Sequence, residues 1–240
     1  MKPHVDANSP STVEGVACFS KSISFKFGET TKNPPTGEAV TQTSLLIGFE
    51  KYKFGRLLGR GGCGATFLAF DSSLQRLVVI KVPLGLMDET KRKRLIAEAR
   101  VTAQLHHSSI VTVHEVLDIT TVPSDWRTVG VRPGQCALVM DYVEGQQLDQ
   151  ALGSRSFSKK EILQLTQCIL EALGEAHRHK AVHCDIKPAN ILLPNGQPVL
   201  IDFGLTAMVG IVLEQGAGTP TYMAPEQITG GTIDGRSDLF

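Results

Sequence analysis

Several patterns that define common classes of protein are missing from this sequence of 240 residues. Its five cysteines are scattered and form no C-x-x-C pair, so neither a disulfide framework nor a zinc site is signalled, and a reducing, cytoplasmic setting fits best. The N-terminus lacks the apolar segment of a signal peptide, and no apolar run approaches the length of a membrane span. The formal net charge is zero, which gives no reason to expect nucleic acid or an anionic membrane as a partner.

A P-loop is missing as well, because G-x-x-x-x-G-K-[ST] occurs nowhere in the chain. Residues 1–50 are rich in Ser, Thr, Gly and Pro, and we expect a disordered or weakly ordered arm there. Hydrophobic residues make up 42% of the sequence, which is ordinary for a globular protein. The part of the chain from about residue 51 onward is therefore the part that should fold.

Apolar periodicity predicts a sheet followed by helices. Five strands are expected, at residues 52–58, 66–70, 76–82, 110–117 and 137–142. A helix should begin at Asp88, a plausible N-cap, and end near residue 105, with a buried face formed by Leu95, Ile96, Ala99 and Ala103. Residues 120–135 contain Pro, Gly and the only tryptophan, Trp126, and are expected to form a loop.

Helical patterns dominate the second half of the chain. Ser158 and Glu161 have the spacing of a capping box, which predicts a helix start. The apolar stripe that follows should be core, and it consists of Ile162, Leu165, Ile169, Leu173 and Ala176. His177 and His179 are expected only to favour the C-terminus of this helix. A short hairpin is predicted further on, around Asn195 and Gly196.

Three glycines, Gly59, Gly61 and Gly64, occupy a strand–turn–strand corner. A dinucleotide-binding turn needs a helix after its glycines, whereas a strand follows here. A hairpin of this kind can lay its backbone over nucleotide phosphates, which favours a glycine-rich lid. A glycine hairpin that binds no ligand fits the motif equally well.

Charged and amide side chains are concentrated at two further places. Lys81 lies inside an apolar strand and must reach solvent or find an anion, and Glu98 on the next helix could turn toward it. The loop from residue 183 to 190 contains the acid Asp185, the cation Lys187 and the amide Asn190. Such a loop is typical of a chemical site, although a polar surface turn is the alternative.

The order and spacing of these groups, followed by Asp-Phe-Gly at residues 202–204 and Ala-Pro-Glu at 224–226, resemble the eukaryotic-like protein kinase family. The resemblance covers residues 52–240, and residues 218–227 look most like the bacterial branch. It implies an α+β fold of two lobes. Residues 51–143 would form an N-lobe with an antiparallel five-stranded sheet and one helix, and residues 144–240 an incomplete, mainly helical C-lobe.

The resemblance implies an ATP- and Mg²⁺-dependent Ser/Thr kinase. Asp185 would accept the proton of the substrate hydroxyl, Lys187 would neutralise charge near the γ-phosphate, and Lys81, held by Glu98, would contact the α- and β-phosphates. The implied magnesium ligands are Asn190 and Asp202. The ATP pocket would be lined by Leu58, Gly59, Gly61, Gly64, Thr66, Val79, Lys81, Met140, Asp141, Val143 and Leu192. The expected partners are ATP and a protein substrate with Ser or Thr, without nucleic acid or a membrane segment in this chain.

Some positions depart from the family pattern. Cys184 replaces the arginine that pairs with a phosphorylated activation loop, and residues 204–224 contain no serine. We therefore expect activity that does not depend on phosphorylation of that loop. Val79 and Thr66 should make the nucleotide pocket tighter and more polar. Thr102 stands where an apolar residue usually packs on Phe203, so its buried hydroxyl needs a partner.

The family pattern continues past the position of Phe240, so we expect this sequence to be a fragment of a longer kinase. Residues 235–240 resemble the start of the central C-lobe helix, with Asp238 placed to hold the backbone near His183. Glu226 is expected to be unpaired, because its usual arginine partner would lie further on. A pseudokinase-like module that binds nucleotide or a partner without transfer is the alternative. Phosphotransfer to a small molecule is a third hypothesis.

Overall fold

The structure is a computed structural model, and it describes residues 51–61, 64–122, 124–203, 207–208 and 219–240. The predicted N-terminal arm, Gly204 and most of the predicted activation loop lie outside the described residues. All described residues belong to one compact unit. A boundary between two lobes near residue 143 stays a prediction.

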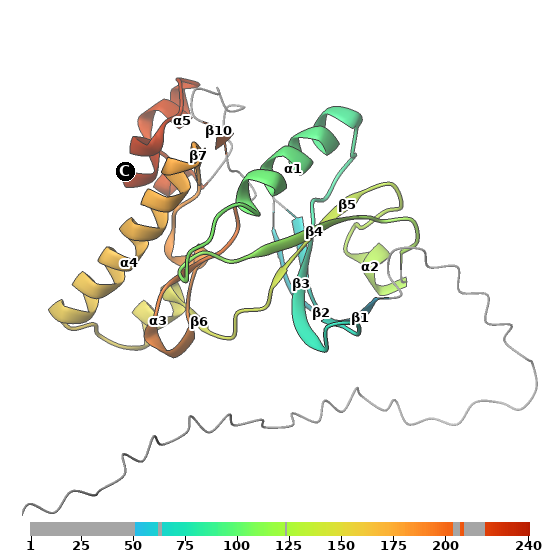
Figure 1. Cartoon of the computed structure of the whole chain (residues 1–240), viewed down its shortest axis with the longest axis horizontal. Helices are drawn as coiled ribbons and strands as arrows, with labels where there is room; N and C mark the ends of the chain where they lie inside the picture. The colour runs from blue at the N-terminus through green and yellow to red at the C-terminus, as the bar shows by residue number, and fades with distance from the viewer. Residues whose placement is uncertain (1–50, 62–63, 123, 204–206, 209–218) are drawn as a thin grey trace, which may run out of the picture. The chain divides into compact units, whose positions relative to one another are not determined.

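A five-stranded antiparallel sheet forms the first part of the described chain, as predicted (Figure 1). Its strands lie in the order β1-β2-β3-β5-β4, and their bounds are Tyr52–Gly61, Gly64–Asp71 and Arg76–Val82 for β1 to β3, and Val113–Asp118 and Cys136–Asp141 for β4 and β5. The predicted strand from residue 110 begins three residues later, because Ile110 forms a bridge with Leu200 instead.

Side chains alternate between the two faces of this sheet along each strand. Apolar clusters cover both faces. In β5, Val139 joins one apolar cluster together with Trp126. Its neighbour Leu138 joins another cluster together with Leu95 of α1 (Glu89–Thr102). Trp126 belongs to α2 (Ser124–Thr128), a short helix inside the segment predicted as a loop. Figure 1 shows α1 and α2 on opposite sides of the sheet.

Helix α1 begins as predicted, because the carboxylate of Asp88 accepts a hydrogen bond from the backbone N–H of Lys91 at 2.8 Å. Leu95 and Ala99 are buried, which confirms the predicted face in part. The prediction for Ala103 is wrong, since this residue follows the last helical turn and is exposed.

The second part of the described chain is mainly helical. Its helices are α3 (Leu148–Ser154), α4 (Lys159–Arg178) and α5 (Pro225–Thr229). Short strands and 3-10 turns connect them, namely β6 (Gln146–Gln147), β7 (Ala181–Val182), β8 (Ile191–Leu193), β9 (Val199–Leu200), β10 (Ala207–Met208) and the turns Pro188–Asn190, Pro194–Gly196, Pro220–Tyr222 and Gly235–Leu239. The predicted hairpin is confirmed, because β8 and β9 pair antiparallel and both Asn195 and Gly196 have positive φ.

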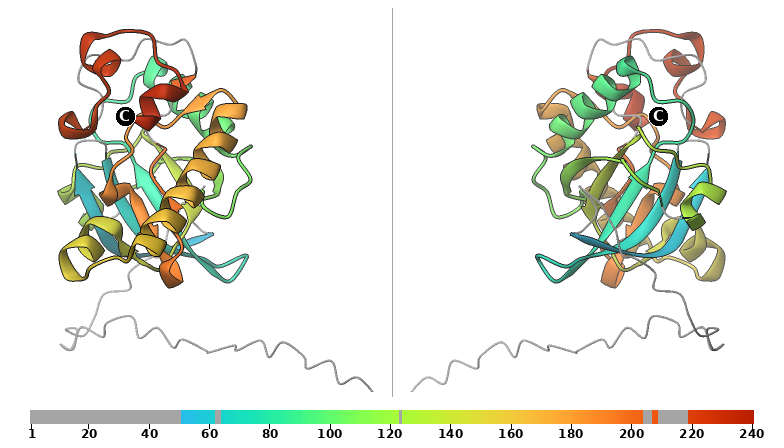
Figure 2. Two further views of the ribbon diagram at one scale, coloured as in Figure 1. Left: turned by 90° about the vertical axis from the view of Figure 1, so that its left-hand side faces the viewer. Right: turned by 90° about the vertical axis from the view of Figure 1, so that its right-hand side faces the viewer.

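Helix α4 has the predicted capping box, in which Ser158 and Glu161 bond each other's backbone N–H. Its predicted apolar stripe is buried only in part. Leu173 and Ala176 are buried, whereas Ile162 is 52% exposed. The contacts of the helix with β7 and with the turn at residues 235–239 lie at its C-terminal end, so they do not cover Ile162 near its start (Figure 2). Within the described residues, no helix combines the length and apolar character needed to cross a bilayer.

Candidate active site

A cavity of about 570 Å³ lies beneath the glycine hairpin, a size typical of small-molecule sites. Its lining brings together most residues that the sequence predicted for an ATP pocket, namely Leu58, Gly59, Thr66, Val79, Lys81, Met140, Asp141, Val143 and Leu192. The predicted magnesium ligands Asn190 and Asp202 line it as well. The lining does not include Gly61 or Gly64.

The glycines of the hairpin differ in what the fold requires of them. Gly64 has a φ of +154°, and a Cβ there would lie 2.5 Å from the carbonyl oxygen of Val82. A side chain at position 64 would therefore strain the backbone. At Gly59 an added Cβ would meet no atom within 4 Å. Glycine at this position is not needed for packing, and its absent side chain leaves room over the cavity.

Other cavity residues were not anticipated from the sequence. They are Arg56, Val111, Tyr142, Gly145, Gln147, Gln150, Ala189 and Ile201. The carboxamide of Gln147 donates to the carbonyl of Ala189 at 2.9 Å and accepts from Gln150 at 3.0 Å. Gln147 lies on the two-residue strand β6 and Gln150 on the seven-residue helix α3, and elements this short carry no periodic signal.

Lys81 does not contact the carboxylate that the sequence suggested. Its amine forms an ion pair with Asp202, while Glu98 accepts from the Arg94 side chain at 3.2 Å. Arg94 competes successfully because it lies one helical turn before Glu98, at the spacing where side chains on a helix meet. Lys81, Glu98 and Asp202 nevertheless line one narrow cavity of about 10 Å³.

The Thr102 hydroxyl, for which the sequence predicted a need for a partner, donates to the backbone carbonyl of Glu98 at 3.0 Å. This bond to the residue four positions earlier satisfies the hydroxyl without a polar contact in the core. Thr102 and Phe203 line the same narrow cavity as Glu98.

Asp185 lies at the centre of a network formed by the predicted loop. One carboxylate oxygen accepts from the amine of Lys187 at 2.6 Å and from the carboxamide of Asn190 at 2.9 Å. The other oxygen accepts from the backbone N–H of Thr219 at 3.1 Å. Lys187 also donates to the Thr219 hydroxyl at 2.6 Å. An acid, a cation and an amide from one loop therefore meet at a single point, as the spacing suggested.

Comparison with known proteins places this chain in a family. Residues 52–240 match the protein kinase domain. The chain belongs to the protein kinase family. The kinase-like α+β fold inferred from the sequence is thereby confirmed, and the relatives described next confirm its resemblance to bacterial Ser/Thr kinases.

Several relatives of this kinase domain are bacterial. It is 35% identical over 204 residues to a probable serine/threonine-protein kinase of Streptomyces coelicolor, covering 79% of this chain and 28% of that protein. It is 33% identical over 226 residues to serine/threonine-protein kinase pkn3 of Myxococcus xanthus, covering 87% and 38%. It is 31% identical over 204 residues to a probable serine/threonine-protein kinase PknB of Bifidobacterium longum, covering 79% and 28%. The chain thus spans well under half the length of these relatives.

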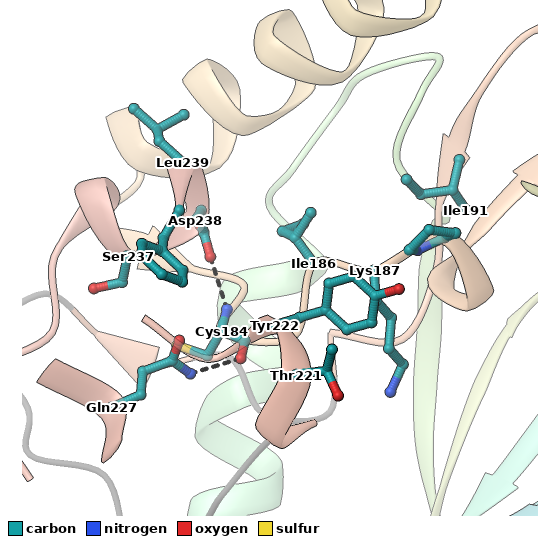
Figure 3. Close-up of a pocket in the computed structure, with 12 residues that line it drawn as sticks. Cys184, Ile186, Lys187, Ile191, Thr221, Tyr222, Gln227, Ser237, Asp238 and Leu239 are labelled. Atoms are coloured by element: carbon teal, nitrogen blue, oxygen red, sulfur yellow. Dashed lines mark hydrogen bonds between the residues drawn. The ribbon is translucent and has the colours of Figure 1, made fainter. Parts of the chain in front are cut away.

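The loop that carries Asp185 in this kinase domain is held from below by Asp238, as predicted. Its buried carboxylate accepts from the backbone N–H of His183 at 2.9 Å and of Cys184 at 2.8 Å. Gln227 donates to the carbonyl of Cys184 at 2.8 Å, and Figure 3 shows this bond together with the one that the backbone N–H of Cys184 donates to Asp238. Cys184 has a φ of 66°, a left-handed conformation that these bonds hold in place.

Two histidines of the kinase domain have structural roles. His177 Nε2 lies 2.8 Å from the Asp238 carboxylate, so it does more than favour the end of its helix. His183 is fully buried, and burial lowers its pKa, so the ring is neutral. Its Nδ1 accepts from the N–H of Asp185 at 3.3 Å, so Nε2 carries the proton and donates to the carbonyl of Ile201 at 3.2 Å. His183 therefore links the Asp185 loop to the segment before Asp202.

The prediction that Glu226 is unpaired is wrong. The hydroxyl of Ser237 donates to its carboxylate. The reason is that the 3-10 turn Gly235–Leu239 brings Ser237 beside α5.

We expect Glu98 to make the stability of this kinase domain depend on pH. Burial raises its pKa from 4.5 to about 7, and the charges of Arg94 and Lys81 offset this only in part. Between these values the folded state holds a proton that the unfolded chain releases, so the free energy of unfolding falls as pH rises. The fall should reach about 3 kcal/mol. Urea unfolding at pH 5 and pH 8 measures it against Glu98→Gln, which lacks this proton, and parallel pH profiles would contradict the assignment.

Proposed function

We propose that residues 52–240 form an ATP- and Mg²⁺-dependent kinase domain that transfers the γ-phosphate of ATP to Ser and Thr hydroxyls of protein substrates. The observation that supports this most is the bonded set of Asp185, Lys187 and Asn190, which reaches a nucleotide-sized cavity through Asn190. The family and its Ser/Thr kinase relatives support the same assignment.

The proposed reaction needs little from the protein beyond positioning and charge. The substrate hydroxyl oxygen bonds to the γ-phosphorus, the bond from that phosphorus to the β-bridging oxygen breaks, and ADP leaves. Asp185 accepts the hydroxyl proton. Lys187, 2.6 Å from Asp185, places its positive charge beside the transferred group. Lys81 exchanges Asp202 for the α- and β-phosphates and takes Glu98 as its support.

The cavity suits Mg²⁺ because two lining residues offer oxygen ligands. Asp202 supplies a carboxylate and Asn190 a carboxamide, and Mg²⁺ takes oxygen ligands together with substrate phosphates. These two residues would hold the ion, which when bound neutralises charge on the triphosphate. The partners proposed here are accordingly ATP and a Ser/Thr-containing protein, and we propose no nucleic-acid partner.

Two measurements test this function. ATP with Mg²⁺ at 100 times the dissociation constant should stabilise the chain by about 2.7 kcal/mol, seen as a rise in unfolding temperature. Labelled phosphate from ATP should then appear on serine- and threonine-containing peptides, and should vanish in Lys81→Met. A folded sample without a thermal shift would defeat the proposal. Binding without transfer would identify the pseudokinase-like alternative.

We expect Gly59→Val to weaken ATP binding about tenfold, or 1.4 kcal/mol, because the new side chain would occupy the space over the cavity. Its unfolding free energy should stay within about 0.5 kcal/mol of the wild type, since no atom lies near the added Cβ. Gly64→Ala is the control with the opposite expected result. Its free energy of unfolding should fall, while its ATP affinity should stay close to that of the wild type. Isothermal titration and urea unfolding separate the two effects. Equal ATP affinity in Gly59→Val and the wild type would contradict the prediction that the glycine hairpin covers the bound nucleotide.

A cytoplasmic location is proposed on chemical grounds. The described cysteines Cys136 and Cys168 are free thiols, which suits a reducing compartment.

A further inference from the structure

The described residues 119–122 and 124–135, here called the β4–β5 segment, belong to the connection between two strands that need a far shorter one. Asp118 and Cys136 are paired across the sheet, and a two-residue turn can connect such a pair. The segment instead forms α2 and packs on the face of the sheet opposite α1 (Figures 1 and 2). Its buried apolar residues are Ile119, Val122, Trp126 and Val131.

The β4–β5 segment packs directly on the strand that roofs the nucleotide cavity. The ring of Trp126 stacks on Phe67 of β2, with centroids 3.7 Å apart and planes 15° apart. The neighbouring residue Thr66 points the other way, because side chains alternate along a strand, and it lines the cavity. Trp126 therefore lies on one side of β2, and the ligand space lies on the other side. A shift of this strand changes the stacking of Trp126 on Phe67.

The same segment holds the linker that leads into α1. Gln135 is 2% exposed, and its carboxamide donates to the carbonyls of Pro83 at 3.2 Å and Gly85 at 2.9 Å. Its oxygen accepts from the N–H of Arg132 at 2.7 Å, within the segment itself. The linker thus cannot move without breaking bonds that are expensive to lose in a buried place. Helix α1, which follows, carries Glu98.

We propose that the β4–β5 segment is a positioning element of the kinase site, with Trp126 fixing the cavity roof and Gln135 fixing the entry to α1. Trp126 and Gln135 act through Phe67 and the linker, and neither touches the ligand space. The inference rests on the proposed nucleotide binding. It assigns a role to the one tryptophan of the chain and makes this residue a built-in reporter of ligand binding.

Fluorescence of this single tryptophan gives the first test. Titrating the full chain with ATP and Mg²⁺ should change the emission of Trp126, with a midpoint equal to the dissociation constant obtained from the thermal shift. Unchanged emission in a sample whose unfolding temperature rises would overturn the inference and leave nucleotide binding intact. If neither signal changes in a folded sample, the proposed function fails, and the inference fails with it.

Variants separate positioning from simple stability. Trp126→Ala should weaken ATP binding about tenfold, whereas Trp126→Phe, which keeps an aromatic ring on Phe67, should stay within about twofold. Leu173→Ala, a truncation of a buried residue in α4, is the control that lowers the unfolding temperature without changing the dissociation constant. If Trp126→Ala binds ATP as tightly as Leu173→Ala does, Trp126 is structural only and the proposal is overturned.

Gln135→Met tests the linker, and it serves even if Trp126→Ala does not fold. Methionine keeps the length of the side chain and removes its donors and acceptor. We expect kcat to fall about tenfold while the ATP dissociation constant stays within about twofold, because α1 and not the cavity roof loses its anchor. Unchanged kcat in a folded Gln135→Met variant would overturn the assignment of the linker.

Discussion

Asp185→Asn is expected to lower the rate of phosphate transfer by about 10²–10⁴-fold, the usual contribution of a positioned base. The carboxamide cannot accept the hydroxyl proton, and it leaves one oxygen for the three donors that Lys187, Asn190 and Thr219 now direct at the carboxylate. The dissociation constant of ATP should change by less than about twofold, because Asp185 does not line the cavity. Transfer to a peptide at saturating ATP, with binding measured separately, checks both expectations.

Asp88→Asn is the matched control for this change. It makes the same chemical substitution at the N-cap of α1, where asparagine caps as well as aspartate does, so rate and stability should both persist. An Asp185→Asn variant that retained a tenth or more of the wild-type rate would show that Asp185 is not the base. The reaction would then have to be assigned to another group or to the substrate itself.

The parts of this kinase domain that could be predicted depend on local pattern. Strand β3 is recognisable as a short apolar run that contains one cation, Lys81, and the two-residue period of a strand places Lys81 on the cavity face together with Val79. The capping box at Ser158 fixes the start of α4 for the same reason, since donor and acceptor lie three residues apart. Signals of this kind need no knowledge of the rest of the chain.

The partner of Lys81 could not be predicted, because it is decided by competition between distant groups. Glu98 and Asp202 both lie beside Lys81, and Arg94 is a second cation within reach of Glu98. Burial of Glu98 raises its pKa to about 7, so near neutral pH its carboxyl group is partly protonated and attracts a cation less strongly. The order of the motifs identifies the participants, whereas their pairing depends on desolvation that only the packed structure defines.

Short elements were missed for a different reason. Helix α3 has no side-chain cap at Gln147, and α2 is five residues long, so neither carries a start signal or a full period. Trp126 is fixed by Phe67, nearly sixty residues earlier in the chain. A helix held by such a contact is stabilised by tertiary packing and not by its own sequence.

Asp238→Ala is expected to lower the free energy of unfolding by about 3–5 kcal/mol, the range for removing one partner of a buried charged network. The side chain of Asp238 is fully buried and accepts from the backbone N–H groups of His183 and Cys184 and from His177. Without it these donors are buried and unsatisfied, and the left-handed backbone at Cys184 loses a support. Urea unfolding measures the loss directly.

The same variant should also slow phosphate transfer, because the loop between His183 and Asp185 is held at its base by Asp238 alone among the described carboxylates. Asp234→Ala provides the comparison, since Asp234 caps the same short turn but is partly exposed, and its loss should lower the free energy of unfolding much less than the loss of Asp238. Equal losses in the two variants would show that Asp238 acts as an ordinary cap. If Asp238→Ala loses stability but keeps the wild-type kcat, the Asp185 loop keeps its geometry without Asp238. Gln227, which donates to the carbonyl of Cys184, would then be sufficient to hold the loop.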